Sequence, residues 1–584
     1  MIGALTSLVL LVVTALSATF ADASFVEFDQ AATVPDLTVD LDYAVYKGYS
    51  DSTTKLNVWL GIRYAAAPYG DLRWRAPQTP KTNRKIQDAS SYGSVCFQSY
   101  PAIAGAPPMP EGDEDCLFLN VYAPPLTTGS KKPLPLPVLI FYHGGGFSWG
   151  DGRTDMSAII NDNENSFIGV SIQYRLGPFG FLSSSEVKAK GTPNAGLLDT
   201  AFALQWVEKH IHKFGGDKDR ITVAGESAGA GALLHLSLAP NIKSKFQGIA
   251  ASPYLPGQHD YDGEVPTKRY YAFAAQAGCG SSGEVLDCLR RKDSVALQNA
   301  NYNVTVSGPV YRTWAFEPVT DGTYILGRPS QTLLKKKVNG RAILVGTNAN
   351  EGALFVPQDD ISTLEELKAW LHLKYPLFSD EDIQKVLEVY PNSDAPDDPS
   401  ALKFATNGIS GATNINMSQV ATGHLQRANA IVAEATFICP SYWLSASYLN
   451  KPTYHYQYSV PFAAHLEDVY AYFGPNQPQQ SPSFSRAFRQ IWGNFITNTN
   501  PAVPSQPGLE TWPKWVDGTG AKMMNLNTTG GTPYEATTQF GVKVTQFTEP
   551  GLENKFGVVG AWDWEGGRGK RCEFWKGMMD KIPT

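Results

Sequence analysis

Short, continuous apolar runs recur along the chain and predict buried strands. They read "PVLIFYHGGG" (137–146), "FIGVSIQY" (167–174), "ITVAG" (221–225) and "AILVG" (342–346). Runs without polar alternation are typical of strands whose two faces are both covered, as in a parallel sheet. The chain is therefore expected to place these segments in the middle of a sheet.

A helical pattern lies between two of these runs. In "GLLDTAFALQWVEKHIHKFGG" (196–216) apolar side chains recur at helical spacing, and Gly215 supplies the stop. The recurring positions are Leu197, Ala201, Leu204, Ile211 and Phe214. Strands that alternate with helices predict an α/β fold with a mostly parallel sheet, helices on both faces and active groups at the carboxyl ends of strands.

Composition narrows the class of protein. The 584 residues are 43% hydrophobic and 12% aromatic, which predicts a large globular core. No linker, charge run or fixed-period repeat divides the chain, so one large domain is expected over residues 24–584. The net charge is −7 and the basic residues are scattered, which argues against a nucleic-acid partner.

The first residues predict a secretory signal peptide over residues 1–23. An apolar run is followed by Ala21-Asp22-Ala23, an A-x-A cleavage site before Ser24. An uncleaved membrane anchor is the alternative, but the run is short for a span and no Lys or Arg flanks it. We therefore expect a secreted, extracellular protein without stable membrane anchoring.

The cysteines fit an oxidising destination. Six are present, and proximity suggests Cys96 with Cys116 and Cys279 with Cys288, leaving Cys439 and Cys572, although other pairings are open. No C-x-x-C or HExxH motif occurs, so neither a metal nor a cofactor is expected. Candidate glycosylation sequons begin at Asn303, Asn416 and Asn527.

A sharp turn is predicted at "VAGESAGAGALLHLS" (223–237), directly after an apolar run. A serine at the apex of a strand-to-helix turn needs very small neighbours two residues away, and Gly225 and Gly229 provide them. The amide of Ala228 would open the helix, where negative charge is stabilised. Ser227 is thus a candidate nucleophile, with an ordinary helix cap as the alternative.

A nucleophilic serine needs a histidine as base and a carboxylate that orients it. In this fold class the acid and then the histidine follow the serine along the chain. His465 follows the aromatic strand predicted at 453–460, whereas His455 falls within it, and Glu351 follows the run at 342–346. These are good but not unique choices, since other histidines follow Ser227: His235, His259, His372 and His424.

A glycine-rich segment follows the first run. His143-Gly144-Gly145-Gly146 would expose amides that can stabilise negative charge on a carbonyl oxygen. A merely flexible loop is the alternative, but with the G-x-S-x-G frame downstream the segment matches the donor loop of this fold.

Together these motifs resemble the type B carboxylesterases, the family of α/β-hydrolases that includes cholinesterases and certain fungal lipases. The motifs are "GIRYAAAPYGDLRWRAP" (61–77), "EDCLFLNVY" (114–122), "HGGGF" (143–147), "QYRLGPFGFL" (173–182), "GESAGA" (225–230), "FEPVTDG" (316–322), "NEGALF" (350–355) and "WGNFITNTNP" (492–501). The resemblance implies Ser227, Glu351 and His465 as catalytic residues. It also implies the amides of Gly145, Gly146 and Ala228 as the oxyanion hole.

The resemblance implies further features. It supports the pairs Cys96–Cys116 and Cys439–Cys572, and it implies Ser252 and Asp468 as polar support around the site, with solvation at the surface as the alternative. Glu226, which directly precedes the nucleophile, either tunes His465 or merely closes the turn. Relatives place acyl-pocket side chains where Phe147, Trp314 and Phe316 stand here, with packing in the core as the alternative for Trp314 and Phe316.

Two departures bear on the substrate. Residues 97–115 contain no tryptophan that could stack on a quaternary ammonium, which disfavours choline esters. Their four prolines disfavour a helical lid. The sequence therefore predicts a secreted serine carboxylesterase acting on small-molecule esters through an acyl-enzyme, with a lipase or sterol esterase as alternative and a non-catalytic binding relative as a remote one.

Overall fold

The continuous apolar runs form the central strands of one large sheet. The computed structural model describes residues 36–582 except 104, 109–110, 126–133, 392–413, 416–417 and 540. The strands of the large sheet follow the order β16-β15-β14-β13-β10-β9-β7-β8-β6-β4-β3. The strands are β3 (Tyr49–Ser50), β4 (Asn57–Arg63), β6 (Phe118–Ala123), β7 (Leu136–Tyr142), β8 (Ile168–Ile172), β9 (Gly216–Glu226), β10 (Phe246–Ala251), β13 (Ile343–Asn348), β14 (Thr453–Tyr458), β15 (Lys522–Thr537) and β16 (Lys543–Gly560). From β8 to β15 all neighbouring strands are parallel, and the strands at both edges are antiparallel.

The sheet separates two hydrophobic cores. Successive residues of β7 show this, because Ile140 and Tyr142 belong to one core while Leu139 and Phe141 belong to the other. A strand that buries both faces has no polar alternation, which explains the unbroken apolar run in the sequence. The predicted α/β fold with a mostly parallel, doubly covered sheet is confirmed.

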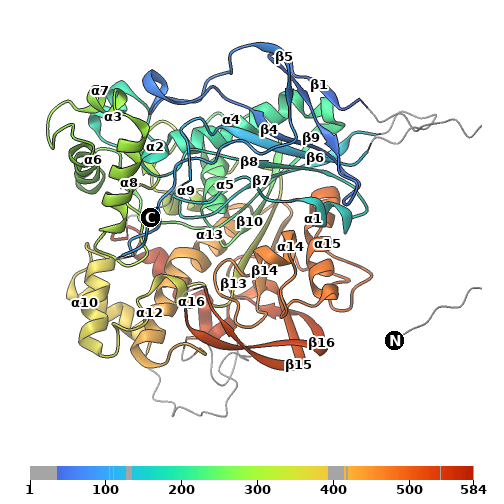
Figure 1. Cartoon of the computed structure of the whole chain (residues 1–584). Helices are drawn as coiled ribbons and strands as arrows, with labels where there is room; N and C mark the ends of the chain where they lie inside the picture. The colour runs from blue at the N-terminus through green and yellow to red at the C-terminus, as the bar shows by residue number, and fades with distance from the viewer. Residues whose placement is uncertain are drawn as a thin grey trace, which may run out of the picture. The chain divides into compact units, whose positions relative to one another are not determined.

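Helices cover both faces of this sheet (Figure 1). On one face lie α4 (Ala195–His210), α5 (Ala228–Leu238), α9 (Pro329–Leu334) and α13 (Cys439–Ser447), and on the other α1 (Ser157–Asn161), α14 (Val469–Phe473) and α15 (Pro482–Asn498). The predicted helix at 196–216 is α4, which tightens to a 3₁₀ turn over Ile211–Phe214 and ends at Gly215 with φ +88°. This left-handed conformation is the reason a glycine stops the helix there.

Further elements surround the sheet. Two small sheets contain β1 (Thr38–Asp40), β2 (Ala44–Lys47) and β5 (Asn83–Asp88), and β11 (His259–Asp260) with β12 (Val319–Thr320). The remaining helices are α2 (Gly177–Phe181), α3 (Ser185–Lys190), α6 (Glu264–Gln276), α7 (Leu286–Arg290), α8 (Ser294–Val306), α10 (Leu364–Lys374), α11 (Asp380–Val389), α12 (Gly423–Ala433) and α16 (Trp564–Gly577). Across the described ranges, no helix is both long and apolar enough to span a bilayer.

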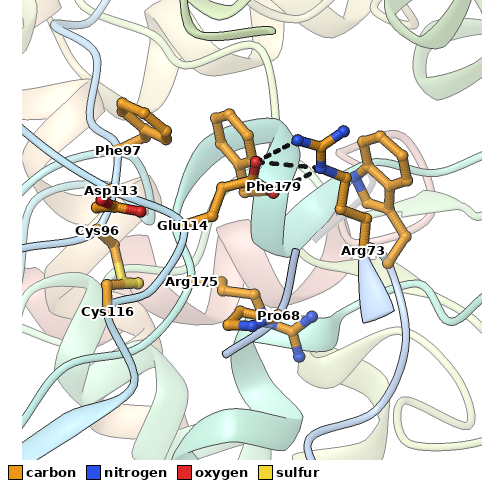
Figure 2. A pocket seen from close by; sticks show the side chains of 10 residues that line it. Pro68, Arg73, Cys96, Phe97, Asp113, Glu114, Cys116, Arg175 and Phe179 are labelled. Atoms are coloured by element: carbon orange, nitrogen blue, oxygen red, sulfur yellow. Dashed lines mark hydrogen bonds and ion pairs between the residues drawn. A yellow bond between two sulfur atoms is a disulfide. The ribbon is translucent and has the colours of Figure 1, made fainter. Parts of the chain in front are cut away.

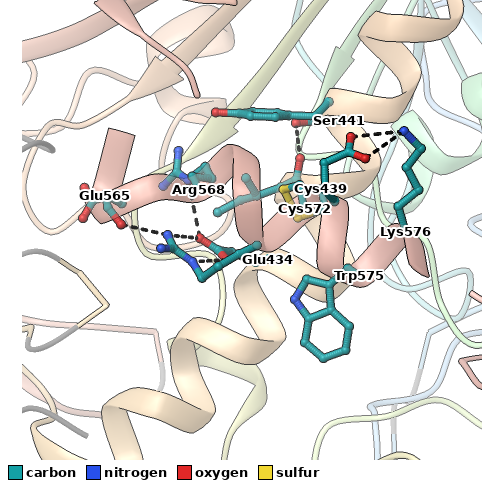
Figure 3. The surroundings of a disulfide bond; sticks show 12 residues. Glu434, Cys439, Ser441, Glu565, Arg568, Cys572, Trp575 and Lys576 are labelled. Atoms are coloured by element: carbon teal, nitrogen blue, oxygen red, sulfur yellow. Dashed lines mark hydrogen bonds and ion pairs between the residues drawn. A yellow bond between two sulfur atoms is a disulfide. The ribbon is translucent and has the colours of Figure 1, made fainter. Parts of the chain in front are cut away.

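Three disulfides join Cys96–Cys116, Cys279–Cys288 and Cys439–Cys572, the pairs that the sequence suggested. Figure 2 shows the first beside a buried ion pair, in which Glu114 accepts hydrogen bonds from the guanidinium of Arg73. The third ties α16 to α13 (Figure 3).

The same region holds a second buried charge cluster. Figure 3 shows Glu434 beside Arg568, and the carboxylate of Glu434 also accepts hydrogen bonds from Arg571 at 2.7 and 2.8 Å. Glu434 opens a short π-helix, Glu434–Ile438, that leads into α13. Because a buried carboxylate is stable only when paired and hydrogen-bonded, these arginines fix the start of the π-helix.

Candidate active site

Ser227 lies at a strained turn between β9 and α5. Its φ is +53° and its ψ is −121°, a conformation that non-glycine residues rarely adopt. A Cβ on Gly225 would lie 2.3 Å from the carbonyl carbon of Gly229, and a Cβ on Gly229 would lie 1.9 Å from the carbonyl oxygen of Tyr142. Only glycine fits at either position, so the G-x-S-x-G spacing follows directly from the close packing of the turn.

Four candidate residues follow neighbouring parallel strands of the sheet. Ser227 follows β9, Ser252 follows β10, Glu351 lies three residues beyond β13, and His465 lies in the loop after β14. Since β9, β10, β13 and β14 are adjacent and parallel, their carboxyl ends meet at one edge of the sheet. Residues far apart in the sequence are thereby gathered in one place.

The structure brings Ser227, His465 and Glu351 into one hydrogen-bonded row. The Oγ of Ser227 is 2.9 Å from Nε2 of His465, and Nδ1 of His465 is 2.5 Å from Oε2 of Glu351. All three side chains are buried. This geometry suits proton transfer from a serine hydroxyl to an imidazole that a carboxylate holds in position.

A polar network supports the carboxylate of Glu351. Its Oε1 accepts hydrogen bonds from Oγ of Ser252 at 2.5 Å and from the backbone amide of Asn348 at 2.5 Å. The side-chain amide of Asn348 also donates to Oγ of Ser252 and to Oδ1 of Asp468, each at 3.1 Å. Ser252 and Asp468 therefore belong to one hydrogen-bonded network around Glu351, and Asn348 links the two.

Two further buried carboxyls have raised pKa values. Burial, together with the nearby Asp468 and Glu351, raises the pKa of Glu226 well above its usual range. Its Oε1 lies 3.5 Å from Nε2 of His465. Burial also raises the pKa of Asp468 to about 7. Such shifts gather at functional sites, because burial there penalises the charged form.

The ring of His465 is held by aromatic side chains. Its centroid lies 4.5 Å from that of Phe437 and 5.2 Å from that of Phe355. Phe437 belongs to the π-helix that begins at Glu434, and the backbone oxygen of His465 accepts a hydrogen bond from Gln539 at 2.5 Å. Elements from three parts of the chain therefore fix the imidazole.

The glycine segment after β7 lies beside Ser227. A Cβ on Gly144 would lie 3.0 Å from Cβ of Ser227, so this backbone passes directly against the serine. Within the part of the chain that the structure describes, the amides of Gly145 and Gly146 have no hydrogen-bond acceptor. Ala228 is the first residue of α5, where the first amides lack partners inside the helix. Among the described residues these three amides therefore have no backbone acceptor, a condition that an oxyanion hole requires.

A cavity of about 250 Å³ opens onto the serine. Trp314 lines it, but Phe147 and Phe316 do not, because each is buried against other aromatic rings: Phe147 against Phe181 and Tyr254, and Phe316 against Phe273. The described residues between Cys96 and Cys116 form no helix. The lining residues are Tyr100, Pro101, Ile103, Gly145, Gly146, Trp149, Ser227, Arg312, Trp314, Leu354, Phe355, His465, Leu466 and Gln539.

The other predicted positions that the structure describes do not line this cavity. Asn303 is exposed on α8 and Asn527 is half-buried on β15, while Asn416 and the predicted signal peptide at 1–23 fall outside the described residues. His235 and His455 are buried in α5 and β14. In the described ranges no group of His, Cys, Asp or Glu has a metal-binding arrangement.

The fold and this site have clear counterparts among known proteins. The model of the carboxylesterase family matches residues 36–541, and the chain belongs to this family of carboxylic ester hydrolases. It is 34% identical over 364 residues to the para-nitrobenzyl esterase of Bacillus subtilis, covering 61% of this chain and 71% of that protein. It is 27% identical over 484 residues to secreted lipase 4 of Gibberella zeae, covering 80% and 83%.

A solved structure agrees with the assignment of the fold. Aspergillus niger EstA superposes with a TM-score of 0.73 over 94% of this chain and 99% of that one, at 24% identity. The α/β-hydrolase fold inferred from the sequence is thus confirmed.

Sequence reasoning missed several residues of the site. Asn348 carried a signal, since it is a polar residue at the end of a buried strand and stands three positions before Glu351. Arg312, Phe437 and Gln539 carried none, because they come from distant segments that meet only in the folded chain.

Proposed function

We propose that the chain is a secreted serine carboxylesterase that hydrolyses carboxylic esters through a covalent acyl-enzyme. The observation that carries this proposal is the continuous row from Ser227 through His465 to Glu351, with contacts of 2.9 and 2.5 Å. A binding protein of the same fold would not need this row.

The proposed reaction has two halves. Nε2 of His465 takes the proton of Ser227 as Oγ attacks the ester carbonyl, and the amides of Gly145, Gly146 and Ala228 stabilise the oxyanion. His465 then gives the proton to the leaving alcohol. Water, activated by the same imidazole, releases the acid and restores Ser227. Glu351 holds the tautomer of His465 and stabilises its positive form.

The size of the cavity favours short esters. About 250 Å³ lies below the usual 300–1,000 Å³ range of ligand pockets, and the described part of the loop between Cys96 and Cys116 has no helix to act as a lid. We therefore rank a short-chain carboxylesterase above a lipase or sterol esterase. Similarity to a secreted lipase keeps the lipase as the second candidate.

Secretion is part of the proposal. The cleavable segment proposed at residues 1–23 and the three disulfides support it, and so does similarity to a protein named as secreted. The remainder, residues 24–584, is proposed to act as a single catalytic domain.

The proposal is tested by measuring how fast the wild type and Ser227→Ala hydrolyse 4-nitrophenyl esters, from the acetate to the palmitate. Because Ser227 supplies the nucleophile, the variant is expected to lose about a millionfold in kcat. Ser237→Ala is the matched control, because Ser237 lies in α5, the helix that follows Ser227, and its hydroxyl donates to the carbonyl of Leu233. Equal rates in wild type and Ser227→Ala would contradict the mechanism, and a long-chain optimum would favour the lipase.

A further inference from the structure

One permanently charged side chain, Arg312, lines the cavity at Ser227 among the described residues. Most of the cavity's described lining is apolar, aromatic or glycine, and none of the lining residues that the structure describes is Asp or Glu. A cation that faces such a cavity attracts a negatively charged group when a ligand enters.

Arg312 has no ion-pair partner in the described part of the chain. Its Nε donates a hydrogen bond to the hydroxyl of Tyr311 at 2.9 Å, and its guanidinium carbon lies 5.4 Å from the centre of that ring. The tyrosine thus orients the guanidinium without neutralising it. By contrast, Arg73 and Arg175 are paired with Glu114 and Asp199.

A second unused donor stands two residues away. The indole Nε1 of Trp314 is buried and has no acceptor among the described residues, and the residue as a whole is 6% exposed. A Cβ on Gly146 would lie 2.3 Å from Cε2 of Trp314, the carbon bonded to that nitrogen. The donor therefore lies against the glycine segment that we propose binds the oxyanion. A buried N–H without an acceptor is unfavourable unless a ligand supplies one.

The backbone around these donors is held in an unusual conformation. Arg312 has φ +52°, which is unfavourable for a residue with a side chain. Two backbone hydrogen bonds to the loop between Cys96 and Cys116 maintain this conformation of Arg312. The amide of Arg312 donates to the carbonyl oxygen of Ala102, and the amide of Ala102 donates to that of Thr313, each at 2.9 Å. Strained residues held in this way occur at ligand sites.

We propose that the substrate ester carries a carboxylate on one of its two halves and that Arg312, with the N–H of Trp314, binds it. A carboxylate offers oxygens to both donors, and the planar guanidinium suits its geometry. The inference rests on the proposed function of the same cavity. It narrows the substrate class to half-esters of dicarboxylic acids or to esters of hydroxy acids.

The test compares charged and neutral esters of matched shape. On the acyl side, 4-nitrophenyl hemiglutarate is compared with 4-nitrophenyl valerate; on the alcohol side, 4-acetoxybenzoate is compared with its methyl ester. For the half that carries the carboxylate, Arg312→Gln is expected to lower the charged-to-neutral ratio of kcat/KM about 10- to 100-fold. Arg312→Lys should recover part of it.

The control is Arg486→Gln on α15, whose side chain is 66% exposed and lies outside the cavity lining. This variant should leave both ratios unchanged. If Arg312→Gln alters charged and neutral esters by the same factor on both sides, the proposal is overturned.

A binding measurement separates this proposal from the proposed function. Calorimetry on Ser227→Ala should show, for one of the two ester pairs, that the charged ester binds more tightly than its neutral partner. Adding Arg312→Gln should abolish this difference in affinity. A wild type that cleaves no ester contradicts the catalytic role of Ser227, yet this binding difference still supports the role of Arg312. Equal affinities overturn it.

Discussion

The disulfide between Cys439 and Cys572 is expected to contribute more stability than the one between Cys279 and Cys288. The first closes a loop with a sequence separation of 133 and the second one of 9. In the chain-entropy model this gives about 5 kcal/mol for the first and about 2.6 kcal/mol for the second at 25 °C. The difference is about 2.4 kcal/mol.

Side-chain packing also favours a larger loss of stability when the Cys439–Cys572 pair is removed. Cys439 and Cys572 are buried between α13 and α16, so their replacement also removes contacts in the core, whereas Cys279 and Cys288 are partly exposed. The double substitution Cys439→Ala/Cys572→Ala is therefore expected to cost more than the chain-entropy figure alone.

Urea unfolding followed by tryptophan fluorescence measures the effect. The two double alanine variants are compared with the wild type at equal protein concentration, and the free energies are taken from midpoint and slope. The matched control is Cys279→Ala/Cys288→Ala, which removes the same atoms from a short loop. If this control loses as much stability as the long-loop variant, the loop-length argument is refuted.

Two further substitutions probe the site. Gly146→Ala would place Cβ 2.3 Å from Trp314, so kcat for ester hydrolysis should fall about 10²- to 10³-fold. The control Gly322→Ala should leave kcat unchanged, because Gly322 also has a positive φ, +68°, but no described atom lies within 4 Å of its Cβ. Equal losses in the two variants would contradict the role of the Gly146 amide. The pKa of Asp468 is raised to about 7 in the folded protein, so its protonated form stabilises the fold at low pH. This contribution to the free energy of unfolding is lost as the pH rises from about 4 to about 7, by up to about 1.4 kcal/mol per pH unit. Urea unfolding at pH 4.5 and 7.5 should therefore show that Asp468→Asn gains stability relative to the wild type as the pH rises. The control Asp71→Asn, at an exposed position, should show no such gain. A stability difference for Asp468→Asn that does not change with pH would count against the raised pKa of Asp468.

The central sheet could be predicted because burial on both faces leaves a direct mark in the sequence. The run at 137–146 became β7, and the glycine after the predicted helix adopts the left-handed conformation that ends it. The hairpin of β15 and β16 left no such mark. Much of it is solvent-exposed and contains glycine, proline and charged residues, so its sequence resembles a loop.

The candidate site was predictable where spacing alone dictates geometry. Gly225 and Gly229 flank Ser227 because backbone atoms lie where their side chains would be. Gln539 and Phe437 were not predictable, since their contacts with His465 depend on how the hairpin and the π-helix pack on the loop after β14. No periodicity within a segment reports such long-range packing.

The distance in sequence between Ser227 and His465 has a consequence for biosynthesis. The two residues are 238 positions apart, so a ribosome adding about 5–20 residues per second makes the serine roughly 10 to 50 s before the histidine. Until β14 joins β13, the nascent chain holds a serine without its base. A chain destined for export would therefore be synthesised before it has its proposed esterase activity. A fragment that ends before His465 would never acquire this activity.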